Sequence, residues 1–459
     1  MYRKKRHIHF VGIGGIGMSG IAEVLLNLGH EVSGSDLAEG HQAKRLAAMG
    51  AKVSLGHARG NVEGADVVVV SSAVGEDNPE IVEARLTRIP VIPRAEMLAE
   101  LMRLKSSVAV AGSHGKTSTC SMLGTILTEG GLDPTLIIGG KVNNLGLNAR
   151  LGQGEFLVAE ADESDGSFLL LSPTISVVTN IDREHMNYYQ DLDRLKDTFL
   201  SFINKVPFYG AAILCQDDPG VRELIPKVRK RFVTYGLGEG SAVSATDIRK
   251  EEWGHSFELT ANGRPLGRLR INLPGLHNVL NALASSAVSM ELGIGFESLS
   301  RGLSNLSGVG RRFERKGEAM GVRVLDDYGH HPTEIKATLN ALSECFPDNR
   351  KVVIFQPHRH SRTKDLFSEF AHSFHNADLL LLSDIYGAGE TVIPGVDAAR
   401  LAEAIRQNGH GNVSYGGNVS DTARKAVGVI RAGDVVLTLG AGNIWEAGEE
   451  ILRTLAGGG

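Results

Sequence analysis

The chain has 459 residues, a length that predicts about three domains, and its 42% hydrophobic and 22% charged residues supply enough apolar material for several cores. Its formal net charge of −5 excludes a generally basic nucleic-acid-binding protein, so we expect no nucleic-acid partner. The three cysteines, Cys120, Cys215 and Cys345, lie far apart in the sequence, which argues against a disulfide framework and favours a reducing compartment.

The apolar runs of the chain are short. The longest, such as those at 67–70 and 379–382, have the length of strands and fall far short of the ~18 residues that a membrane-spanning helix needs. The basic start at 1–6 leads into a stretch that is too short and too polar for a signal peptide. We therefore expect a cytoplasmic protein without a membrane partner.

Strand and helix patterns alternate along the chain and predict three α/β units, at 1–104, 105–310 and 311–459. In the first unit, strands are expected at 8–11, 31–35 and 65–71, with a helix that ends near residue 28. The second unit has expected strands at 106–112, 156–159, 175–179 and 211–215, helices over 117–129 and 278–292, and a Gly/Ser-rich linker at 304–310. The third has expected strands at 322–325, 352–355, 379–382 and 435–439. Alternation at this spacing predicts parallel sheets.

A glycine-rich turn follows the first expected strand and opens a helix. Gly12, Gly14 and Gly17 form a G-x-G-x-x-G pattern, with Gly15 between them. Such glycines let the backbone approach a pyrophosphate, and the helix N-terminus supplies N–H donors. Asp36, at the end of the next strand, can accept a hydrogen bond from a ribose hydroxyl or a base N–H. The pattern predicts a site for a nucleotide diphosphate but leaves the nucleotide open, and a nicotinamide cofactor would also suit it.

A second glycine loop, at 112–117, also joins a strand to a helix. Lys116 can supply a positive charge to β- and γ-phosphates and Thr117 a hydroxyl to Mg²⁺, while backbone N–H groups cradle phosphate oxygens. The loop departs from the strict P-loop pattern, because only two residues separate Gly112 from Gly115. We nevertheless expect a nucleoside triphosphate here. Two phosphate loops in one chain indicate two nucleotides, one a substrate handle and the other an energy source.

Acidic residues follow the strand expected at 156–159, where ligands lie in parallel α/β sheets. These acids are Glu160, Asp162, Glu163 and Asp165. Glu160 is nearest to the strand and is the candidate Mg²⁺ ligand, while others can form a solvated loop. His185, after the next strand, is either a second metal ligand or an ordinary loop histidine.

A pair of asparagines opens the helix expected at 278–292. Asn278 and Asn281 lie three residues apart, on one face of that helix. They can read an adenine edge or merely cap the helix.

The third unit carries two polar loops, after the strands expected at 322–325 and 352–355, and side by side these loops would converge. Arg359 and Arg362, in the second loop, can form a fork for a carboxylate. A zinc site is the less favoured alternative, and its ligands would be His330, His331, His358 and His360. Arg311 and Arg312, at the linker, either reach a nucleotide phosphate or form a solvated hinge.

Together these segments resemble the Mur ligase family, the ATP-dependent ligases of peptidoglycan synthesis. The resemblance extends over essentially the whole chain. It rests on the segments 12–17, 71–73, 77–80, 94–100, 112–119, 160–165, 184–186, 273–281, 310–313 and 327–334. Ser113 and Ser118 stand where the family usually has threonine, and both keep the hydroxyl.

The resemblance implies a Rossmann-like domain for a UDP-sugar, a central P-loop ATPase-type domain with a parallel or mixed sheet, and a Rossmann-like C-terminal domain for an amino acid. The implied UDP-sugar contacts are Gly12, Gly14, Gly15, Gly17, Asp36 and Ser72. The implied ATP contacts are Gly112, Ser113, His114, Gly115, Lys116, Thr117, Ser118, Asn278 and Asn281, with Arg312 and Asp327 acting from across a domain gap. Thr117 and Glu160 would hold one Mg²⁺ and His185 would help to hold a second. Tyr328, His330, Arg359 and Arg362 would bind the amino acid. Lys116, Glu160, His185, Arg312 and Asp327 are the implied catalytic set.

Within the family, the chain resembles the members that join L-alanine to the lactyl carboxylate of UDP-N-acetylmuramate through an acyl phosphate, releasing ADP and phosphate. Later ligases of the pathway use a carbamylated lysine, and we assign none here because Thr-Phe-Leu-Ser-Phe follows Asp197. Tyr328, Gly329 and His330 favour the alanine-adding members over the recycling ligase, which adds a tripeptide. A nicotinamide dehydrogenase and a nucleotide-switched binding module are the alternatives from other classes. We expect a monomer or a weak homodimer.

Overall fold

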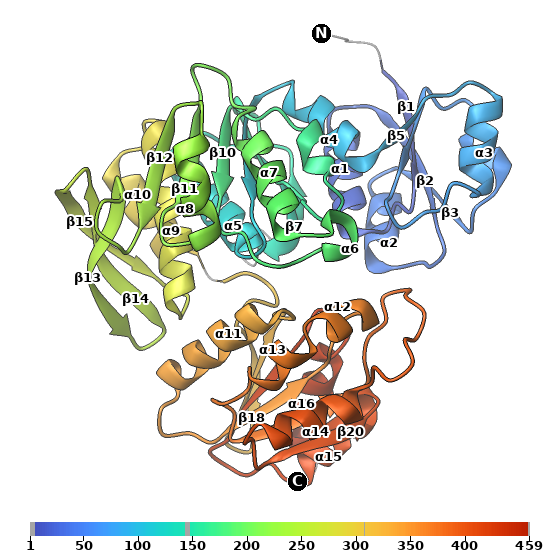
Figure 1. The fold of residues 1–459 in the computed structure, drawn as a ribbon. Coiled ribbons are helices and arrows are strands. Elements are labelled where there is room, and N and C mark those ends of the chain that lie inside the picture. Colours follow the sequence, from blue (N-terminus) through green and yellow to red (C-terminus); the bar gives the residue numbers. More distant parts are fainter. Residues whose placement is uncertain (1–4, 143–146, 307, 458–459) are drawn as a thin grey trace. The chain divides into compact units, whose positions relative to one another are not determined.

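The computed structural model describes residues 5–142, 147–306 and 308–457, which form three sheets with their helices (Figure 1). By compactness the chain divides into two units. One comprises Met1–Ile248, Phe257–Arg270 and Leu280–Leu306, and the other comprises Arg249–Ser256, Ile271–Val279 and Ser307–Gly459. The first two sheets belong mostly to the first unit and the third sheet to the second. The predicted α/β class, with three sheet-centred parts, is confirmed.

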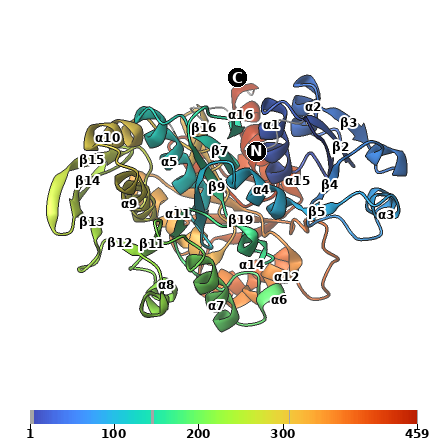
Figure 2. The same cartoon turned by 90° about the horizontal axis from the view of Figure 1, so that it is seen from above.

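The first sheet is parallel throughout, in the order β3-β2-β1-β4-β5. Its strands are β1 His7–Val11, β2 Glu31–Asp36, β3 Lys52–Leu55, β4 Val67–Val70 and β5 Val91–Pro93. Its helices are α1 Ile16–Asn27, α2 His41–Ala48, α3 Pro79–Leu86 and α4 Arg94–Met102, with a 3₁₀ turn at Arg59–Val62. Figure 2 shows α1 and α2 beside β2 and β3. The strand order reverses at β1 and β4, and a crevice for a ligand forms at such a point.

The second sheet is mixed, in the order β15-β14-β13-β12-β11-β10-β6-β9-β7-β8. Its strands are β6 Ser106–Ala111, β7 Thr135–Val142, β8 Leu147–Arg150, β9 Phe156–Glu160, β10 Ile175–Val178, β11 Ala211–Cys215, β12 Phe232–Gly236, β13 Val243–Glu251, β14 Gly254–Ala261 and β15 Arg264–Ile271. Its helices are α5 Lys116–Glu129, α6 Met186–Tyr189, α7 Leu192–Ile203, α8 Pro219–Leu224, α9 Leu276–Glu291 and α10 Phe296–Ser304, with 3₁₀ turns at Ser167–Leu170 and Ile225–Lys227. Strand β6 is parallel to both of its neighbours, β10 and β9, whereas β7 and β8 are antiparallel.

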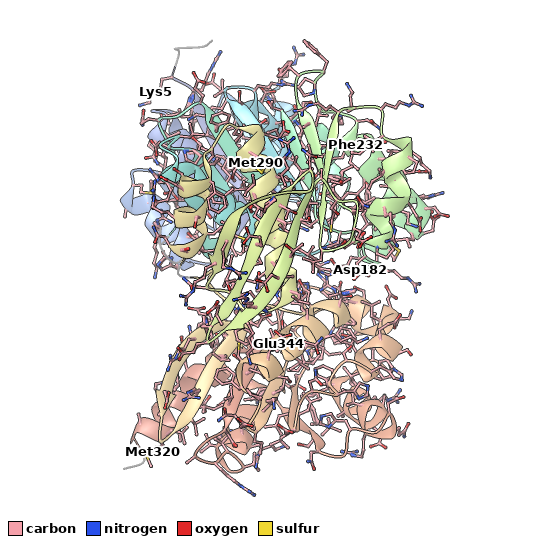
Figure 3. The ribbon with its side chains drawn as sticks, turned by 90° about the vertical axis from the view of Figure 1, so that its left-hand side faces the viewer. Lys5, Asp182, Phe232, Met290, Met320 and Glu344 are labelled. Carbon is pink, nitrogen blue, oxygen red and sulfur yellow. The ribbon has the colours of Figure 1, made fainter. Side chains whose placement is uncertain are left out.

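The third sheet has the order β16-β17-β21-β18-β19-β20 and is parallel except for the pair β16 and β17. Its strands are β16 Glu314–Ala319, β17 Val322–Asp327, β18 Lys351–Phe355, β19 Leu379–Ser383, β20 Val413–Gly417 and β21 Val435–Leu439. Its helices are α11 Pro332–Cys345, α12 His360–Asp365, α13 Phe367–Ala371, α14 Ala398–Gln407, α15 Val419–Val427 and α16 Trp445–Gly457. The exposed Met320 lies at the tip of the β16–β17 hairpin (Figure 3).

The predicted strands agree with the observed ones to within a few residues, because most are continuous apolar runs that a two-sided parallel sheet buries. One prediction about their arrangement was wrong. The strands at 322–325 and 352–355 are not adjacent, because β21 lies between β17 and β18. The segment predicted as a linker, 304–310, starts at the last residue of α10 and includes Val309, which bridges to Arg312; residue 307 lies outside the described residues.

Helix α7 illustrates how the second sheet is covered. Its apolar residues recur at helical spacing, so that Leu195, Phe199, Phe202 and Ile203 are all buried. The ring of Phe168 packs against Phe199 and Phe202, with centroids 5.3 and 4.9 Å away. Burial of each such side chain contributes about 1.5–3 kcal/mol to folding. In the part of the chain that the structure describes, no helix is long and apolar enough to cross a membrane.

A buried carboxylate links three segments of the first domain. Glu80, in the first turn of α3, is fully buried, and its Oε2 accepts a hydrogen bond from Ser35 Oγ (2.5 Å) and lies 3.4 Å from His9 Nε2. Its Oε1 accepts from Asn61 Nδ2 (2.5 Å) and from the N–H of Ala58 (3.2 Å). Burial by itself raises the pKa of Glu80, but the hydrogen bonds from His9, Ser35 and Asn61 outweigh it and lower the pKa to about 2.

Replacing Glu80 by Gln should lower the free energy of unfolding at neutral pH by roughly 3 kcal/mol, because the carboxyl pKa falls from 4.5 to about 2 on folding. Since the folded-state pKa is depressed, this stability is present above about pH 4.5 and is lost as the pH falls toward about 2. Urea unfolding of both proteins between neutral and acidic pH measures the difference, which should shrink with acid. A difference that stays constant with pH would mean that the charge of Glu80 is not its source.

Candidate functional site

Three loops meet at the carboxyl edge of the second sheet. The glycine loop at 112–115 follows β6, the acidic segment at 160–165 follows β9, and the segment at 179–185 follows β10. Because β6 lies between β9 and β10 and is parallel to both, the three loops leave the sheet side by side. The tertiary structure thus brings the predicted phosphate loop, the predicted carboxylate and His185 to one place.

The backbone of the phosphate loop requires glycine at two positions. Gly112 has φ +129°, and a Cβ there would lie 2.1 Å from Thr179 Oγ1. Gly115, directly before α5, has φ +83°, and a Cβ there would lie 2.5 Å from Asn281 Oδ1. A residue with a side chain would be strained at either of these φ angles, and neither position has room for a Cβ atom.

The segment after β10 supports the same loop. The N–H of His114 donates to Asn180 Oδ1 (2.8 Å), and the Ser113 hydroxyl accepts from the N–H of Asp182 (2.9 Å). His114 Nε2 lies 3.0 Å from Asp182 Oδ2. Ser113 therefore shapes the loop through its hydroxyl.

Lys116, the first residue of α5, points back over the loop. Its Nζ donates to the carbonyl oxygens of Gly112 and Ser113 and to both carboxylate oxygens of Glu163, at 2.9 and 2.8 Å. Burial alone would lower the pKa of Lys116, but the Glu163 carboxylate raises it above its ordinary value, so the lysine stays charged. Burial raises the pKa of Glu163 to about 7, and Lys116 opposes that rise.

Glu163 is the main residue of this site that we did not single out from the sequence. Its side chain is 2% exposed, whereas the sequence permitted a solvated place for it among the acids after Glu160. No spacing in the segment distinguishes it from Asp165. Only the packing of the acidic segment against α5 reveals the contact with Lys116.

The residues expected to hold metal lie around this ion pair. Thr117 is buried in the first turn of α5, and Glu160 Oε1 accepts from the N–H of Gly139 (2.8 Å). His185 Nε2 lies 3.7 Å from Glu163 Oε1 and 3.9 Å from Glu184 Oε2, and the ligand atoms of these three residues all lie within 4.8 Å of one another. Carboxylate, hydroxyl and imidazole donors of this kind fit a divalent cation beside phosphates.

Helix α9 brings its two asparagines to different neighbours. Asn281 Oδ1 accepts from Thr119 Oγ1 (3.3 Å), so this side chain contacts α5 directly behind the phosphate loop. Asn278 Nδ2 donates to the carbonyl oxygen of Pro274 (2.7 Å), just before the helix. Both side chains are buried.

The first glycine loop, after β1, is held by Asp36. The N–H of Gly14 donates to Asp36 Oδ2 (2.8 Å), and a Cβ on Gly14 would lie 2.9 Å from the same oxygen. Ser72, after β4, is exposed at the same carboxyl edge. Asp36 therefore shapes this loop, a role that the sequence did not indicate.

Arg94 connects the two loop regions of the first compact unit. It begins α4, and its Nη2 donates to Asp162 Oδ2 (2.9 Å) in the acidic segment after β9. A Cβ on Gly17, in α1, would lie 3.1 Å from Arg94 Nη1. One guanidinium thus contacts the helix that follows the first glycine loop and the acids that border the second.

In the third domain, Asp327 ends β17 and is buried. Its Oδ2 accepts from the N–H of Phe313 and its Oδ1 from the N–H of Gly329, both at 2.7 Å. Burial raises the pKa of Asp327 to about 6, and Arg312 opposes this. Because Arg311 and Phe313 have φ of +58° and +49°, Asp327 holds a turn that side chains rarely adopt.

The two arginines of this turn have different partners. Arg311 Nε donates to Asp326 Oδ2 (2.9 Å), and its Nη2 donates to the carbonyl oxygen of Gly440 (2.6 Å), in the loop that follows β21. Arg312 Nη1 lies 3.7 Å from Glu334 Oε1. Both guanidinium carbons lie 5.1 Å from the ring centroid of Tyr328. Arg311 is therefore anchored rather than solvated.

The loops after β17 and β18 do meet, although these strands are not neighbours. The rings of His330 and His358 lie 5.6 Å apart, and Arg362 Nη1 donates to His358 Nδ1 (3.2 Å). Burial, with His330, Arg362 and Arg359 nearby, lowers the pKa of His358 to about 3, so this imidazole is neutral. Arg359 is exposed, with φ +70° at the start of α12.

The zinc alternative is not supported. His331 caps α11, where its Nδ1 accepts from the N–H of Thr333 (3.3 Å). Within the described residues, no three of the four histidines at 330, 331, 358 and 360 bring their ring nitrogens together as a metal-ligand group.

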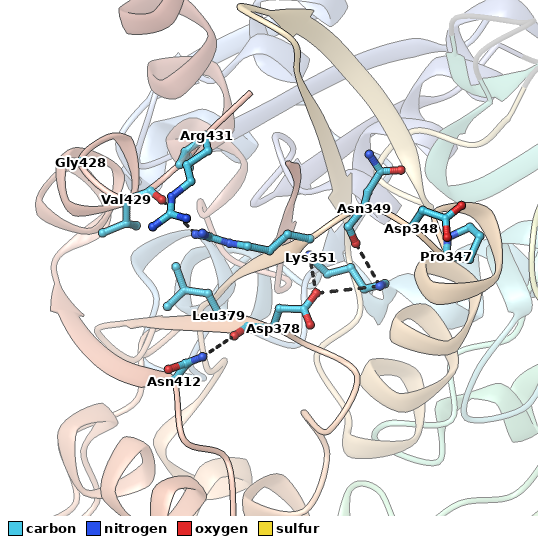
Figure 4. Close-up of a pocket in the computed structure, with 12 residues that line it drawn as sticks. Pro347, Asp348, Asn349, Lys351, Asp378, Leu379, Asn412, Gly428, Val429 and Arg431 are labelled. Carbon is cyan, nitrogen blue, oxygen red and sulfur yellow. Dashed lines mark hydrogen bonds and ion pairs between the residues drawn. The ribbon is translucent and has the colours of Figure 1, made fainter. Parts of the chain in front are cut away.

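The third domain also has a groove of about 800 Å³ at the edge of its sheet where the parallel strands begin, whereas the loops described above follow the ends of the strands. Arg350 lines it, as do Lys351 and Asp378, where β18 and β19 begin (Figure 4). Lys351 Nζ lies 3.9 Å from Asp378 Oδ2. The groove is therefore remote from the loops that carry His330, Arg359 and Arg362.

These features define a multidomain α/β protein whose central sheet carries a phosphate loop of the nucleotide-binding type. Three family models match the chain: the Mur ligase family catalytic domain at residues 7–106, the Mur ligase middle domain at 110–289, and the Mur ligase glutamate ligase domain at 311–442. The chain belongs to the Mur ligase family.

Individual relatives agree with this assignment. A UDP-N-acetylmuramate–L-alanine ligase of Geobacter sp. strain M21 is 58% identical, with 99% of each chain covered. The crystal structure of the UDP-N-acetylmuramate-alanine ligase of Thermotoga maritima is 28% identical, with a TM-score of 0.84 over 99% of this chain and all of the other. A murein peptide ligase from Psychrobacter arcticus is 25% identical, with a TM-score of 0.73 over 98% of this chain and 99% of that one.

Proposed function

We propose that this chain is an ATP-dependent ligase that joins L-alanine to the lactyl carboxylate of UDP-N-acetylmuramate in peptidoglycan precursor synthesis. The observation that carries the proposal is the meeting of Lys116, Glu160 and His185 at the carboxyl edge of one sheet, in a chain 58% identical to a relative of that name. We further propose that it acts in the cytoplasm as a monomer or weak homodimer, with domains at 1–104, 105–310 and 311–459.

The chemistry requires activation of the carboxylate, because its negative charge repels an amine and its oxygen is a poor leaving group. Transfer of the γ-phosphoryl group from ATP to the lactyl carboxylate makes an acyl phosphate and leaves ADP. Lys116 would stabilise the charge on the phosphoryl group during transfer. The amine of L-alanine then attacks the acyl carbon, a tetrahedral intermediate forms, and phosphate leaves as the amide forms.

Each domain would supply one substrate site. Gly12, Gly14, Gly15, Gly17, Asp36 and Ser72 would hold the UDP-sugar, since backbone N–H groups at a helix N-terminus suit a diphosphate. Asn278, Asn281, Arg312 and Asp327 would complete the ATP site formed by residues 112–118. Tyr328, His330, Arg359 and Arg362 would hold L-alanine, because guanidinium groups bind a carboxylate and orient its amine for attack.

The donor set fits Mg²⁺, for which we propose two sites. Thr117 and Glu160 would hold one ion and His185 would help to hold the second. When bound, Mg²⁺ would neutralise phosphate charge and orient the phosphate oxygens.

The recycling reaction, in which a tripeptide replaces L-alanine, is the second candidate, because the Psychrobacter arcticus structure is similar over nearly the whole chain. Phosphate release from ATP, measured with Mg²⁺ and UDP-N-acetylmuramate, separates the two. Release that requires L-alanine supports the proposal, and release that requires L-alanyl-γ-D-glutamyl-meso-diaminopimelate would replace it with the recycling reaction. ATP binding without turnover would indicate a nucleotide-switched module, and NADH binding without ATP binding a dehydrogenase.

A further inference from the structure

Lys116 has its hydrogen-bonding capacity filled within the protein. An ammonium group has three N–H donors, and Lys116 Nζ has four acceptors within 3.3 Å, two of them carboxylate oxygens of Glu163. A lysine that binds phosphate from a loop of this kind must turn at least one donor toward the phosphate. The partner it can most readily give up is not a loop carbonyl, because those carbonyls belong to the backbone that cradles the phosphate.

The carboxylate of Glu163 is held firmly in place. It is 2% exposed, and the carbonyl oxygen of the same residue accepts a hydrogen bond from the buried Tyr189 hydroxyl. On its other side His185 Nε2 lies 3.7 Å from Glu163 Oε1. Glu163 thus presents both of its carboxyl oxygens to Lys116, at 2.9 and 2.8 Å, much as a phosphate group would present two of its oxygens.

We propose that Glu163 is a positioning residue that occupies the phosphate subsite of Lys116 while the loop is empty and is displaced from the lysine by nucleotide phosphate. The carboxylate keeps the buried ammonium paired, and therefore charged and aimed over the loop, before nucleotide arrives. Nucleotide binding then exchanges one anion for another on Lys116. This inference rests on the proposed function, since it requires the loop to bind a nucleoside triphosphate.

The exchange has two opposed consequences, which a purely structural role for Glu163 would not have. Removing the carboxylate should destabilise the empty protein, because it leaves a buried charge without its counter-ion. It should also tighten nucleotide binding, because phosphate no longer competes with a bound carboxylate. A residue that merely holds the loop in shape would weaken both properties when it is replaced.

The test compares E163Q with wild type in two measurements that need no turnover: the thermal unfolding of the empty protein, and the Kd for ADP and for a non-hydrolysable ATP analogue, by calorimetry without Mg²⁺. We expect a lower Tm for E163Q and a Kd lower by about tenfold. Nucleotide binding to E163Q no longer breaks the charge-assisted hydrogen bond between Lys116 and the Glu163 carboxylate, and one such bond corresponds to a factor of about that size. D165N is the matched control, since it removes a charge from the same segment, where Asp165 accepts from the N–H of Ser167 instead. Its Kd should stay close to that of wild type.

A Kd for E163Q that is unchanged or higher would overturn the proposal, and so would an equal tightening in D165N, which would reflect a general loss of negative charge. If E163Q does not fold, E163D carries the test, because its shorter side chain loosens the contact with Lys116 and should lower the Kd by a smaller factor. Steady-state kinetics separate the effect on binding from the effect on turnover. In E163Q the KM for ATP should fall by a larger factor than kcat changes. Wild-type protein that binds no nucleotide would refute the proposed function itself, a result distinct from either variant outcome.

Discussion

Replacing Lys116 by Met should reduce ATP-dependent ligation by about 10³-fold, with most of the loss in kcat. A preorganised cation at a transferring phosphoryl group contributes more to the transition state than to the bound substrate, and the loss of one such group costs about 10²- to 10³-fold or more. Phosphate release under saturating ATP, UDP-N-acetylmuramate and L-alanine measures the effect.

The control for this variant must separate catalysis from stability, because K116M leaves the buried Glu163 carboxylate without its counter-ion. Lys105 offers a comparison, since its Nζ donates to the carbonyl oxygens of Gly152 and Gly154, both at 2.7 Å, away from the phosphate loop. K105M should lower the Tm and retain turnover. Retained turnover in folded K116M would remove that lysine from the mechanism.

Replacing Arg359 by Met should raise the KM for L-alanine by roughly 10- to 100-fold, with a smaller change in the KM for ATP. A charge-assisted hydrogen bond to a carboxylate contributes about 1.5–3 kcal/mol, which corresponds to that range. Arg359 is the arginine of the pair that is exposed beside the loop, whereas Arg362 already donates to His358. Initial rates over a range of L-alanine concentrations, at saturating ATP and UDP-sugar, give the two constants.

Lys364 provides the matched control for Arg359. It is an exposed cation of the same short helix, α12, and K364M removes an equal charge from it. Its kinetics should match those of wild type. If R359M and K364M raise the KM for L-alanine equally, long-range charge rather than a contact with the substrate carboxylate explains the effect.

Much of the fold follows from local sequence patterns. The valines of β4 and the apolar runs of β6, β10 and β21 predict strands, because a strand covered on both faces needs apolar side chains at every position. The glycines at 12, 112 and 115 mark the two predicted phosphate loops, because few residue types other than glycine adopt their positive φ angles. Strand β16, which forms an antiparallel hairpin with β17, differs in this respect, since it is half exposed and has no apolar run to reveal it.

Strand order and side-chain partners depended on the tertiary structure. Nothing local to β21 shows that it inserts between β17 and β18, because parallel pairing joins it to strands that lie far earlier in the chain, with Val435 opposite Arg323 on one side and Lys351 on the other. For the same reason Asp36, Asp327 and Arg311, which we considered for ligand contacts, have protein partners that no motif announced.

The sequence by itself therefore determined where the two glycine loops lie and predicted both as phosphate loops, since that pattern resides in a few consecutive residues and their backbone angles. Only the tertiary structure decided which acid faces Lys116. Four acids lie within six residues at the end of β9 and directly after it, and the choice of Glu163 comes from the packing of that segment against α5 and α6, where burial selects one carboxylate and pairs it with the lysine.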